Sequence, residues 1–448
     1  MQSISLPQRL ARGIYSLIFG CLLPVIILRL LAKSLKQPLY RQHLLERLGY
    51  GTRHSGHSIW IHAVSVGEMK VAVLLLERIR VDVPAIPVVL TCTTAAGRQL
   101  AEKHLRTAHR NIFIRYFPFD LAVCMRRFVR SVQPVMLLTM ETELWPNLLH
   151  MLKQQDIPVL LLNARMSAPS MRSYIKWAMF TRTMFRSIAW VGAQYPLDRK
   201  RFIRLGVAAD RVDLTGNIKI DASVASTDHQ WAGELQTKIQ QRPVWVAGSV
   251  RKGKEEDAVM QAHMHILQDM PDALLILVPR HPERTAKMVR KIKAYHLSYT
   301  LFSVTAADIA PAVQVLVVDA IGLLQGCYQV AQVAFVGGSI AKTGGQNILE
   351  PFLAGTPVIA GPHLYNFATL SRLLEQKGAL TRLQEAALNQ QIQELYTHLL
   401  YLLHHPDQAK QRADLGRDFI QSQKGSLERT LQKVREYLAQ QHLMSTHV

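Results

Sequence analysis

The sequence predicts an α/β protein with two doubly wound parallel sheets. From Ser58 onward, short apolar runs of strand length alternate with amphipathic stretches of helix length, and a second series of the same kind begins at Val244. This alternation is typical of parallel sheets with helices on both faces. The chain has 448 residues, of which 49% are hydrophobic. That is enough to form two domains, each with its own core.

Before these series, the stretch Ile14–Leu28 is almost wholly apolar. Basic residues flank it, with Arg9 and Arg12 before it and Lys33, Lys36 and Arg41 after it. The stretch is short for a spanning helix, which needs about 20 apolar residues. A buried core helix is one alternative, and a secretory signal is another, although no small-x-small cleavage site follows. We expect residues 1–40 to form a membrane anchor, either within one leaflet or as a marginal span, with the protein body on the cytoplasmic side.

The first α/β series is expected to form an N-terminal Rossmann-like domain over residues 41–225. Its predicted strands are Ile59–Val64, Val88–Thr93, Ile112–Tyr116, Val135–Thr139, Val159–Asn163, Trp190–Ala193 and Val212–Thr215. Helices are expected between them, for example at Leu121–Ser131 and Leu144–Gln155. Residues 226–242 are polar and end at Pro243, so an interdomain linker is predicted there.

The second series is expected to form a C-terminal Rossmann-like domain over residues 243–448. Its predicted strands are Val244–Ala247, Leu274–Val278, Val315–Val318, Val333–Val336 and Pro357–Ala360. From Leu388 to the end, the pattern predicts helices that belong to the same domain. Ligands of such sheets bind beyond the carboxyl ends of the strands.

The net charge of +21 indicates an anionic partner, such as nucleic acid, phospholipid head groups or a phosphorylated substrate. The four cysteines have neither metal nor redox spacing, which suggests reduced thiols on a cytosolic face. The sequence contains no His-Glu-x-x-His, no Walker A motif and no G-x-G-x-x-G fingerprint. We therefore expect neither a metal nor a nicotinamide or flavin cofactor.

A glycine-rich loop over Gly337–Pro351 follows the predicted strand Val333–Val336 and precedes a predicted helix over residues 348–354. Glycines and a helix start suit an anionic ligand. Asn347 as the N-cap with Glu350 three residues later also matches an ordinary capping box. The loop alone does not separate these two interpretations.

Charged residues follow several strands of the first domain. Glu68, after the first strand, suits a general base, although Ser65 three residues earlier again fits a capping box. Glu141 and Glu143 follow the fourth strand. A helix start explains one of them, and the other would be a candidate for positioning a substrate or a partner cation. A lone lysine such as Lys219, after the last strand, is usually solvated, but at the domain junction it could stabilise phosphate charge.

The second domain also carries polar or flexible residues at its strand ends. Ser249 ends the first strand, Arg280 follows the second, and Gly322 follows the third. Each of these residues also has an explanation that needs no ligand, such as a surface salt bridge for Arg280. Together with the glycine-rich loop, they favour a phosphate-bearing ligand over four independent caps.

Several motifs in this order resemble those of the 3-deoxy-D-manno-octulosonic acid (Kdo) transferases of lipopolysaccharide synthesis. The matching stretches are His62–Glu68, Glu141–Asn147, Asn163–Ser167, Pro279–Arg284, Gly337–Ser339 with Gly344–Asn347, and Gly361–Phe367. The resemblance covers nearly the whole chain, including the apolar N-terminus. It implies a GT-B fold, with two Rossmann-like domains that face a central cleft.

The resemblance also implies an inverting transfer of Kdo from CMP-Kdo to lipid IVA, without a metal or another cofactor. The N-terminal domain would hold the acceptor, and the C-terminal domain would hold the donor. The enzyme would lie at the cytoplasmic face of the bacterial inner membrane, next to its phospholipid, and would bind no nucleic acid.

By the same resemblance, Glu68 matches the proton acceptor, and Glu141 and Lys219 match transition-state stabilisers. The positions that match CMP contacts are Pro279, Arg280, Ile321, Gly322, Leu323, Asn347, Ile348, Leu349 and Glu350. Further candidates for substrate contacts are Ser249, Gly338, Ser339 and Asn366. The chain departs from the family pattern at Ala320, Ile321 and Leu323, where Thr, Met and Glu are common, and also at Lys254 and Met166. A side-chain contact at Leu323 would be lost, whereas a backbone contact would not.

Two other functions fit parts of the sequence. One is another GT-B enzyme, such as a transferase or epimerase that uses a UDP-sugar. The other is a non-catalytic, membrane-bound protein that binds nucleic acid or lipid through clusters such as Arg199–Arg201. If the protein is of this non-catalytic kind, replacement of Glu68 by alanine would leave its binding activity unchanged.

Overall fold

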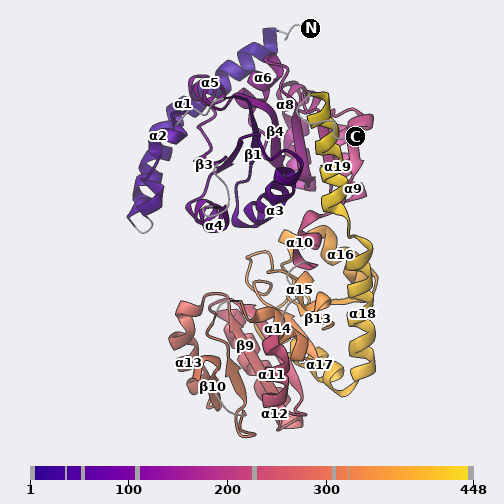
Figure 1. Ribbon diagram of the computed structural model, residues 1–448. Coiled ribbons are helices and arrows are strands. Elements are labelled where there is room, and N and C mark those ends of the chain that lie inside the picture. The colour runs from indigo at the N-terminus through magenta and orange to yellow at the C-terminus, as the bar shows by residue number, and fades with distance from the viewer. Residues whose placement is uncertain are drawn as a thin grey trace. The chain divides into compact units, whose positions relative to one another are not determined.

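The computed structural model describes residues 6–35, 38–51, 56–105, 111–224, 230–304, 309–320 and 322–441. The chain divides into two compact units (Figure 1). Unit 1 comprises Met1–Ala222 together with Lys424–Val448, and unit 2 comprises Ser223–Gln423. Each unit contains one seven-stranded sheet, so the predicted pair of α/β domains is confirmed.

The sheet of unit 1 has the strand order β3-β2-β1-β4-β5-β6-β7, and all its pairs are parallel. Its strands are β1 Ser58–His62, β2 Val88–Cys92, β3 Ile112–Tyr116, β4 Pro134–Met140, β5 Val159–Ala164, β6 Trp190–Ala193 and β7 Val212–Leu214. Its order is that of a Rossmann-like sheet, in which the chain turns back between β1 and β4. All seven strands had been predicted from the apolar runs.

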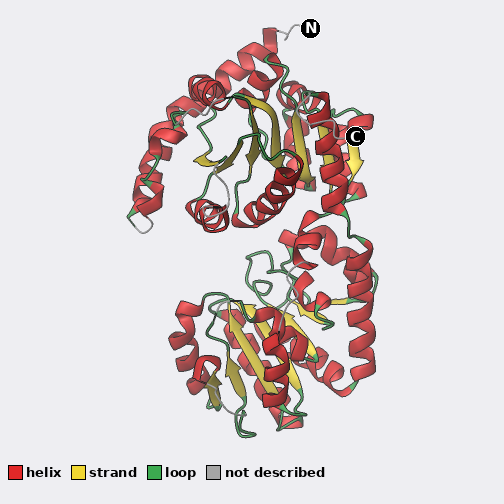
Figure 2. Ribbon diagram, viewed as in Figure 1, coloured by secondary structure: helices red, strands yellow, loops and turns green. Residues whose placement is uncertain are grey.

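Helices connect these strands on both faces of the sheet (Figure 2). They are α3 Val66–Asp82, α4 Ala95–Leu105, α5 Ala122–Val132, α6 Pro146–Gln154, α7 Ala168–Lys176, α8 Ala178–Arg186, α9 Pro196–Leu205 and α10 Ile218–Val224. Because both faces are covered, β1, β2 and β5 are buried at every position. This burial explains why these strands are continuous apolar runs rather than alternating ones.

The last helix, α19 (Ser426–Gln440), packs against α3 of unit 1. Its Leu431, Val434 and Leu438 lie in the same core as residues of β1 and α3. The carboxylate of Asp221 accepts hydrogen bonds from the backbone N–H groups of Gly425 and Leu427, at 3.0 and 2.6 Å. The sequence analysis had placed all terminal helices in the second domain. An apolar helix stripe does not say which core it joins, so only the folded chain assigns α19.

Unit 1 begins with the long helix α1, Leu6–Ser34, which runs along the outside of the unit and packs against α8 and α6 (Figure 1). Among the described residues, α1 contains one 25-residue segment, Leu10–Ser34, that is long and apolar enough to cross a membrane. The helix could therefore anchor the protein, as predicted for residues 1–40. Its central stretch has a mean hydropathy of 2.3.

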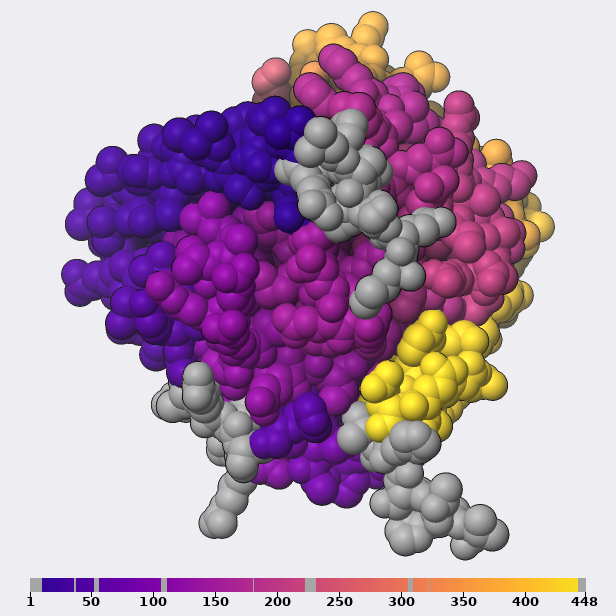
Figure 3. All heavy atoms as spheres, turned by 90° about the horizontal axis from the view of Figure 1, so that it is seen from above, coloured from indigo at the N-terminus to yellow at the C-terminus, as the bar shows by residue number. Residues whose placement is uncertain are grey.

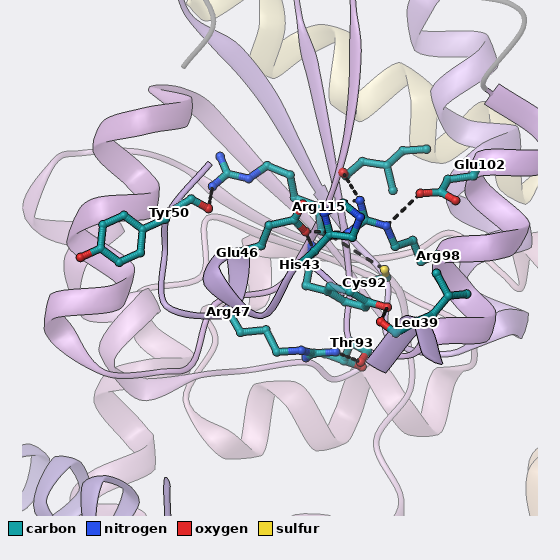
Figure 4. A network of polar contacts seen from close by, with 12 residues as sticks. Leu39, His43, Glu46, Arg47, Tyr50, Cys92, Thr93, Arg98, Glu102 and Arg115 are labelled. Carbon is teal, nitrogen blue, oxygen red and sulfur yellow. Dashed lines mark hydrogen bonds and ion pairs between the residues drawn. The ribbon is translucent and has the colours of Figure 1, made fainter. Parts of the chain in front are cut away.

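The segment after α1 is held on the sheet by a polar network that includes α2, Leu44–Arg47 (Figure 4). Glu46 accepts hydrogen bonds from Arg98 at 2.6 Å and from the backbone N–H of Tyr116 at 2.7 Å. Arg47 donates to the carbonyl of Thr93 and lies 4.0 Å from the centre of the Tyr116 ring. Such charge-assisted bonds in partly buried surroundings fix a segment firmly.

The sheet of unit 2 has the order β10-β11-β9-β8-β12-β13-β14, again with all pairs parallel. Its strands are β8 Val244–Val250, β9 Leu274–Pro279, β10 Tyr299–Leu301, β11 Val315–Val317, β12 Val333–Val336, β13 Val358–Ala360 and β14 Leu380–Arg382. The helices are α11 Gln230–Ile239, α12 Lys254–Asp269, α13 Thr285–Ala294, α14 Leu324–Val330, α15 Leu349–Leu353, α16 Ala368–Gln376, α17 Leu388–His404 and α18 Pro406–Ser422. The sequence analysis missed the edge strands β10 and β14, which have three residues each.

The predicted linker, residues 226–242, contains helix α11 instead of an irregular segment. Residues 225–229 lie outside the described part of the chain. Ala232, Leu235 and Ile239 of α11 are buried in the core of unit 2 beside β8. Their spacing of three and four residues is that of one helix face. Polar residues on the other face concealed this pattern, which corrects the linker prediction.

Candidate functional site

The carboxylates of interest in unit 1 lie where its sheet reverses direction. Glu68 follows β1, while Glu141 and Glu143 follow β4, and these two strands are neighbours at the centre of the sheet. The chain continues from β1 toward β2 and from β4 toward β5. The loops after β1 and β4 therefore diverge, which leaves a crevice at the carboxyl edge where Rossmann-like folds bind ligands.

Glu68 is the third residue of α3 and completes a capping box with Ser65. Its carboxylate accepts hydrogen bonds from the Val64 N–H at 2.9 Å and from the Ser65 hydroxyl at 2.7 Å, and the side chain is buried. Burial raises the pKa of Glu68, the charge of Glu141 raises it further, and the hydrogen bonds from Ser65 and Val64 lower it. The capping interpretation is thus confirmed. A capped carboxylate keeps unused lone pairs, so it can also accept a proton.

Glu141 and Lys219 form an ion pair, with the Lys219 Nζ 2.6 Å from a carboxylate oxygen of Glu141. Glu141 has a φ of 55°, in the left-handed region that non-glycine residues seldom adopt. Lys219 lies in the first turn of α10, after β7. Residues 78 positions apart in sequence therefore meet at one edge of the sheet. The sequence analysis had named both, but nothing in the sequence showed that they pair.

Glu143 belongs to the same cluster, although the sequence did not show whether Glu141 or Glu143 is the positioning carboxylate. Burial, followed by the charges of Glu68 and Glu141, raises the pKa of Glu143 to about 7. Three carboxylates thus interact electrostatically within unit 1. Groups with displaced pKa values in such a cluster are typical of functional sites. The two glutamates in one turn were the available sequence signal.

We expect the charge of Glu143 to make the stability of unit 1 depend on pH. Its pKa of about 7 in the folded protein exceeds the ordinary value of 4.5, so the folded chain binds this proton more tightly than the unfolded chain. The resulting stabilisation is complete below the ordinary pKa and is lost as the pH rises through about 7. Glutamine does not titrate, so the Glu143→Gln protein does not lose stability in this way as the pH rises. The unfolding free energy of the variant, relative to that of the unsubstituted protein, should therefore increase between pH 5 and pH 8.

Urea unfolding curves measured at several pH values test this expectation. Glu77→Gln is the matched control, because Glu77 is exposed on α3 of the same unit. A pH-independent difference between Glu143→Gln and the unsubstituted protein would contradict it.

In unit 2, several predicted positions come from loops at the carboxyl ends of neighbouring strands. Pro279 ends β9, and the exposed Arg280 follows it, with its backbone N–H bonded to the carbonyl of Val250 at 3.0 Å. Gly322 has a φ of 94° and stands two residues before α14, beside Leu323. Ile321 lies outside the described residues. Arg280 and the loop before α14 follow β9 and β11, which are paired strands.

The first half of the glycine-rich loop binds an internal carboxylate. Glu255 of α12 is fully buried, and its oxygens accept hydrogen bonds from four backbone N–H groups. These belong to Arg251 at 2.7 Å, Gly338 at 2.8 Å, Ser339 at 3.0 Å and Ile340 at 3.1 Å. The N–H groups of Gly338 and Ser339 are therefore already engaged, rather than presented to a ligand. The adjacent acids Glu255 and Glu256 after β8 were an overlooked sequence signal.

Close packing accounts for other residues of this loop. A Cβ added to Gly337 would lie 2.6 Å from the carbonyl oxygen of Ser249, so glycine is needed there for backbone contact. The amide of Asn366 donates to the carbonyls of Thr343 and Gly345, each at 3.2 Å. Ser249 and Asn366 thus border the loop and shape it.

The second half of the loop leads into α15, whose N-cap position is Ile348 rather than the predicted Asn347. Asn347 still assists the helix start, because its side-chain oxygen accepts a hydrogen bond from the Leu349 N–H at 3.1 Å. The Asn347 amide also donates to Glu350 at 2.9 Å. Asn347 and Glu350 are half-buried, while Ile348 and Leu349 are buried. Any ligand would therefore meet Asn347 and Glu350 before the two apolar side chains.

Among the described residues, no group of three or more His, Cys, Asp or Glu side chains is arranged to hold a metal ion. The polar groups of unit 1 form a different arrangement. A buried carboxylate lies beside a second carboxylate that is paired with a lysine. Such an arrangement can accept a proton at Glu68 and can place a positive charge at Lys219 near a developing negative one.

Comparisons with known proteins relate the chain to one group of transferases. The family model described as 3-Deoxy-D-manno-octulosonic-acid transferase (kdotransferase) matches residues 42–222. A 3-deoxy-D-manno-octulosonic acid transferase from Haemophilus influenzae is 34% identical over 423 residues, covering 93% of this chain and 96% of that protein. One from Bordetella pertussis is 32% identical over 391 residues, covering 85% and 87%.

Similarity to solved structures supports the fold. The crystal structure of a glycosyltransferase from Rickettsia africae aligns with a TM-score of 0.57 at 12% sequence identity. The alignment covers 86% of this chain and 99% of that protein. At this identity the similarity establishes the fold alone, a pair of Rossmann-like sheets.

Proposed function

The chain belongs to the family of Kdo transferases, which are glycosyltransferases, and we propose that it transfers Kdo from CMP-Kdo to lipid IVA with Glu68 as the general base. Its two Rossmann-like sheets are those of a GT-B enzyme. The observation that carries the proposal is the cluster at the reversal point of the first sheet, where Glu68 lies beside the Glu141–Lys219 pair.

The proposed reaction begins at Glu68. A hydroxyl of the acceptor sugar attacks the anomeric carbon of Kdo, and the Glu68 carboxylate takes the hydroxyl proton. The new carbon–oxygen bond forms as the bond from the anomeric carbon to the phosphate oxygen breaks. CMP leaves as a phosphate monoester and keeps the bonding electron pair. Attack opposite the leaving group inverts the anomeric centre.

Negative charge that moves to the phosphate in this step needs compensation. Lys219 is suited to this, because the ion pair with Glu141 holds its ammonium group at one place. In unit 2, the exposed Arg280 follows β9, where a phosphate can accept hydrogen bonds from its guanidinium. Pro279 and the backbone from residue 321 to 323 would border the nucleotide, and Glu350 would accept hydrogen bonds from ribose hydroxyls.

The proposed location is the cytoplasmic face of the bacterial inner membrane. The apolar helix α1 suits a membrane anchor, and the net charge of +21 suits anionic phospholipid and a phosphorylated glycolipid acceptor. Residues 41–225 would bind the acceptor, and residues 243–423 would bind the donor.

A substitution at Arg280 tests the donor assignment. We expect Arg280→Ala to weaken binding of CMP by about 10-fold to 100-fold, since a hydrogen bond to a charged group contributes roughly 1.5–3 kcal/mol. Isothermal titration with CMP measures the effect. Arg290→Ala is the matched control, because Arg290 is exposed on the neighbouring helix α13. Equal CMP affinity in both variants would contradict the assignment.

The same preparations separate the alternative functions. Transfer is assayed with CMP-Kdo and with a panel of UDP-sugars, using lipid IVA as the acceptor. Mass spectrometry of the product identifies the sugar and counts the residues added. Turnover with a UDP-sugar but not with CMP-Kdo would overturn the proposed donor.

A further inference from the structure

We propose that unit 1 binds the membrane through a two-part surface, in which α1 lies in the plane of the bilayer interface and the turn between α7 and α8 inserts beside it. The α7–α8 turn is defined here by Ile175, Trp177 and Met179. The partner is a bilayer that contains anionic phospholipid. This goes beyond an anchoring role for α1, because it assigns an orientation to the helix and adds a second lipid-binding element.

The two faces of α1 have different surroundings. Tyr15, Phe19, Leu23, Ile26 and Leu30 are half-buried and recur every three or four residues, so they share the less exposed face of the helix. The helix contacts α6, α8 and the short turn Pro38–Tyr40 of unit 1. On the opposite face, each large apolar side chain is 51–69% exposed, and these are Ile14, Leu17, Ile18, Leu22, Val25 and Leu28. A helix that stood across a bilayer would have lipid on both faces. A helix with one covered face suits the interfacial plane.

Contacts in its first half and in the segment that follows it hold α1 in this position. The Asn147 amide of α6 donates to the Ser16 hydroxyl, in the first half of α1, at 3.0 Å. Beyond its end, the polar network around Glu46 fixes the following segment on the sheet (Figure 4). To stand upright, α1 would have to give up its contacts with α6 and α8. In the space-filling view, the indigo N-terminal segment, which includes α1, lies along the edge of unit 1 (Figure 3).

The α7–α8 turn exposes large apolar side chains beside α1. Trp177 is 61% exposed and Met179 is 67% exposed, and Ile175 precedes them. The turn is well supported from within, because the rings of Tyr174 and Phe185 pack edge to face with their centres 5.1 Å apart. Helix α8 contacts both α7 and α1. Because α8 has nine residues, the turn at its start lies within about 14 Å of the contact between α8 and α1.

The charge of this region matches an anionic bilayer. Between Asp156 and Asp198 the sequence contains no acidic residue and five basic ones. Four of these lie exposed on α7 and α8, namely Arg172, Lys176, Arg182 and Arg186. Tryptophan is favoured at the depth of the head groups, with basic residues at the phosphates. Exposed apolar side chains on two helices whose own charged residues are all basic suit a lipid interface better than the mixed charge of a typical protein partner.

Site-directed labelling tests both parts of the surface in the full chain. Cys21 is exposed and is first replaced by serine, and Cys92, Cys124 and Cys327 are buried. A fluorescent label is then placed by Met179→Cys, Val25→Cys or Ile26→Cys. The control is Val81→Cys, because Val81 is 77% exposed at the end of α3. Each protein is reconstituted with vesicles of phosphatidylethanolamine and phosphatidylglycerol, and flotation establishes binding.

The measured quantity is fluorescence loss caused by a nitroxide-labelled lipid with the nitroxide near the head group. We expect strong quenching at 179 and 25, and little at 26 and 81. Equal quenching at 25 and 26 would overturn the in-plane orientation, since a spanning helix exposes both to lipid. An unquenched label at 179 in vesicle-bound protein would overturn the role of the turn. Quenching at 81 as strong as at 179 would also overturn the role of the turn, because it would indicate nonspecific adsorption of the protein to the vesicle.

Discussion

Glu68→Gln is expected to reduce the rate of Kdo transfer by about 10²-fold to 10⁴-fold, the range typical for loss of a general base. Glutamine has nearly the same shape but cannot accept the proton of the acceptor hydroxyl. Its amide oxygen can still accept the hydrogen bond from the Val64 N–H, and its amide nitrogen can donate to the Ser65 hydroxyl. The longer bond from the Ser65 N–H, at 3.3 Å, is lost, but the Ser65 hydroxyl still accepts from the backbone N–H of residue 68. The helix cap should therefore survive, so that the loss reflects chemistry rather than folding.

Two controls separate the two roles of Glu68. Ser65→Ala removes the side-chain cap of α3, which typically costs about 1 kcal/mol, but leaves a carboxylate at position 68. It should lower stability with a much smaller effect on transfer. Affinity for CMP, measured by titration, should be unchanged in Glu68→Gln, because Glu68 lies outside the proposed nucleotide site. Undiminished transfer by a folded Glu68→Gln protein would reduce Glu68 to a helix cap and would make Glu141 or Glu143 the base.

The pH dependence offers an independent check of the same residue. Burial raises the pKa of Glu68, and the base works only as the carboxylate. Transfer should therefore decline on acidification at a pH above the ordinary pKa of a glutamate. In Glu68→Gln, the residual rate should lose this acid limb. These pH profiles report the free enzyme when they are measured as kcat/KM.

Glu255→Gln should destabilise unit 2 by about 3 kcal/mol or more. The Glu255 carboxylate accepts four backbone hydrogen bonds while fully buried, and hydrogen bonds to a charged group are stronger than those to a neutral one. Glutamine replaces one acceptor oxygen with an amide nitrogen that faces N–H donors. At least one pair of donors, either from Arg251 and Gly338 or from Ser339 and Ile340, is then left without an acceptor.

Thermal unfolding in the presence and absence of CMP measures this effect. Lys254→Ala is the matched control, because Lys254 is exposed one residue before Glu255 in the same helix turn. That variant should unfold at nearly the temperature of the unsubstituted protein. A Glu255→Gln protein with unchanged stability and weakened phosphate binding would instead mean that the N–H groups of Gly338 and Ser339 serve a ligand.

Glu255 also shows why the glycine-rich loop was ambiguous from sequence alone. Glycines, a preceding strand and free N–H groups are the same signature whether the anion is a bound phosphate or a carboxylate of the protein. The choice depends on where α12 places its first turn, and that placement follows from packing between β8 and β12. The adjacent acids Glu255 and Glu256 mark a candidate carboxylate in the sequence, but only the folded chain shows that Glu255 reaches the loop.

Local patterns in the sequence were sufficient to predict most strands, the apolar N-terminal helix and the family of this protein. Among the strands that the structure describes, the apolar runs located every one except the short edge strands β10 and β14, because strands buried on both faces must be apolar throughout. The length and composition of residues 14–28 identified an apolar helix that could enter a membrane. The resemblance of short motifs identified the family. Each of these signals lies within a few neighbouring residues.

Only the tertiary structure decided which distant residues meet. The ion pair between Glu141 and Lys219, the carboxylate of Glu255 under the glycine-rich loop and the packing of α19 on α3 each join segments far apart in the sequence. The displaced pKa of Glu143 likewise depends on burial and on the charges of Glu68 and Glu141. Such contacts arise from the strand order and the packing of whole helices, and Coulomb interactions depend on distance in space rather than along the chain.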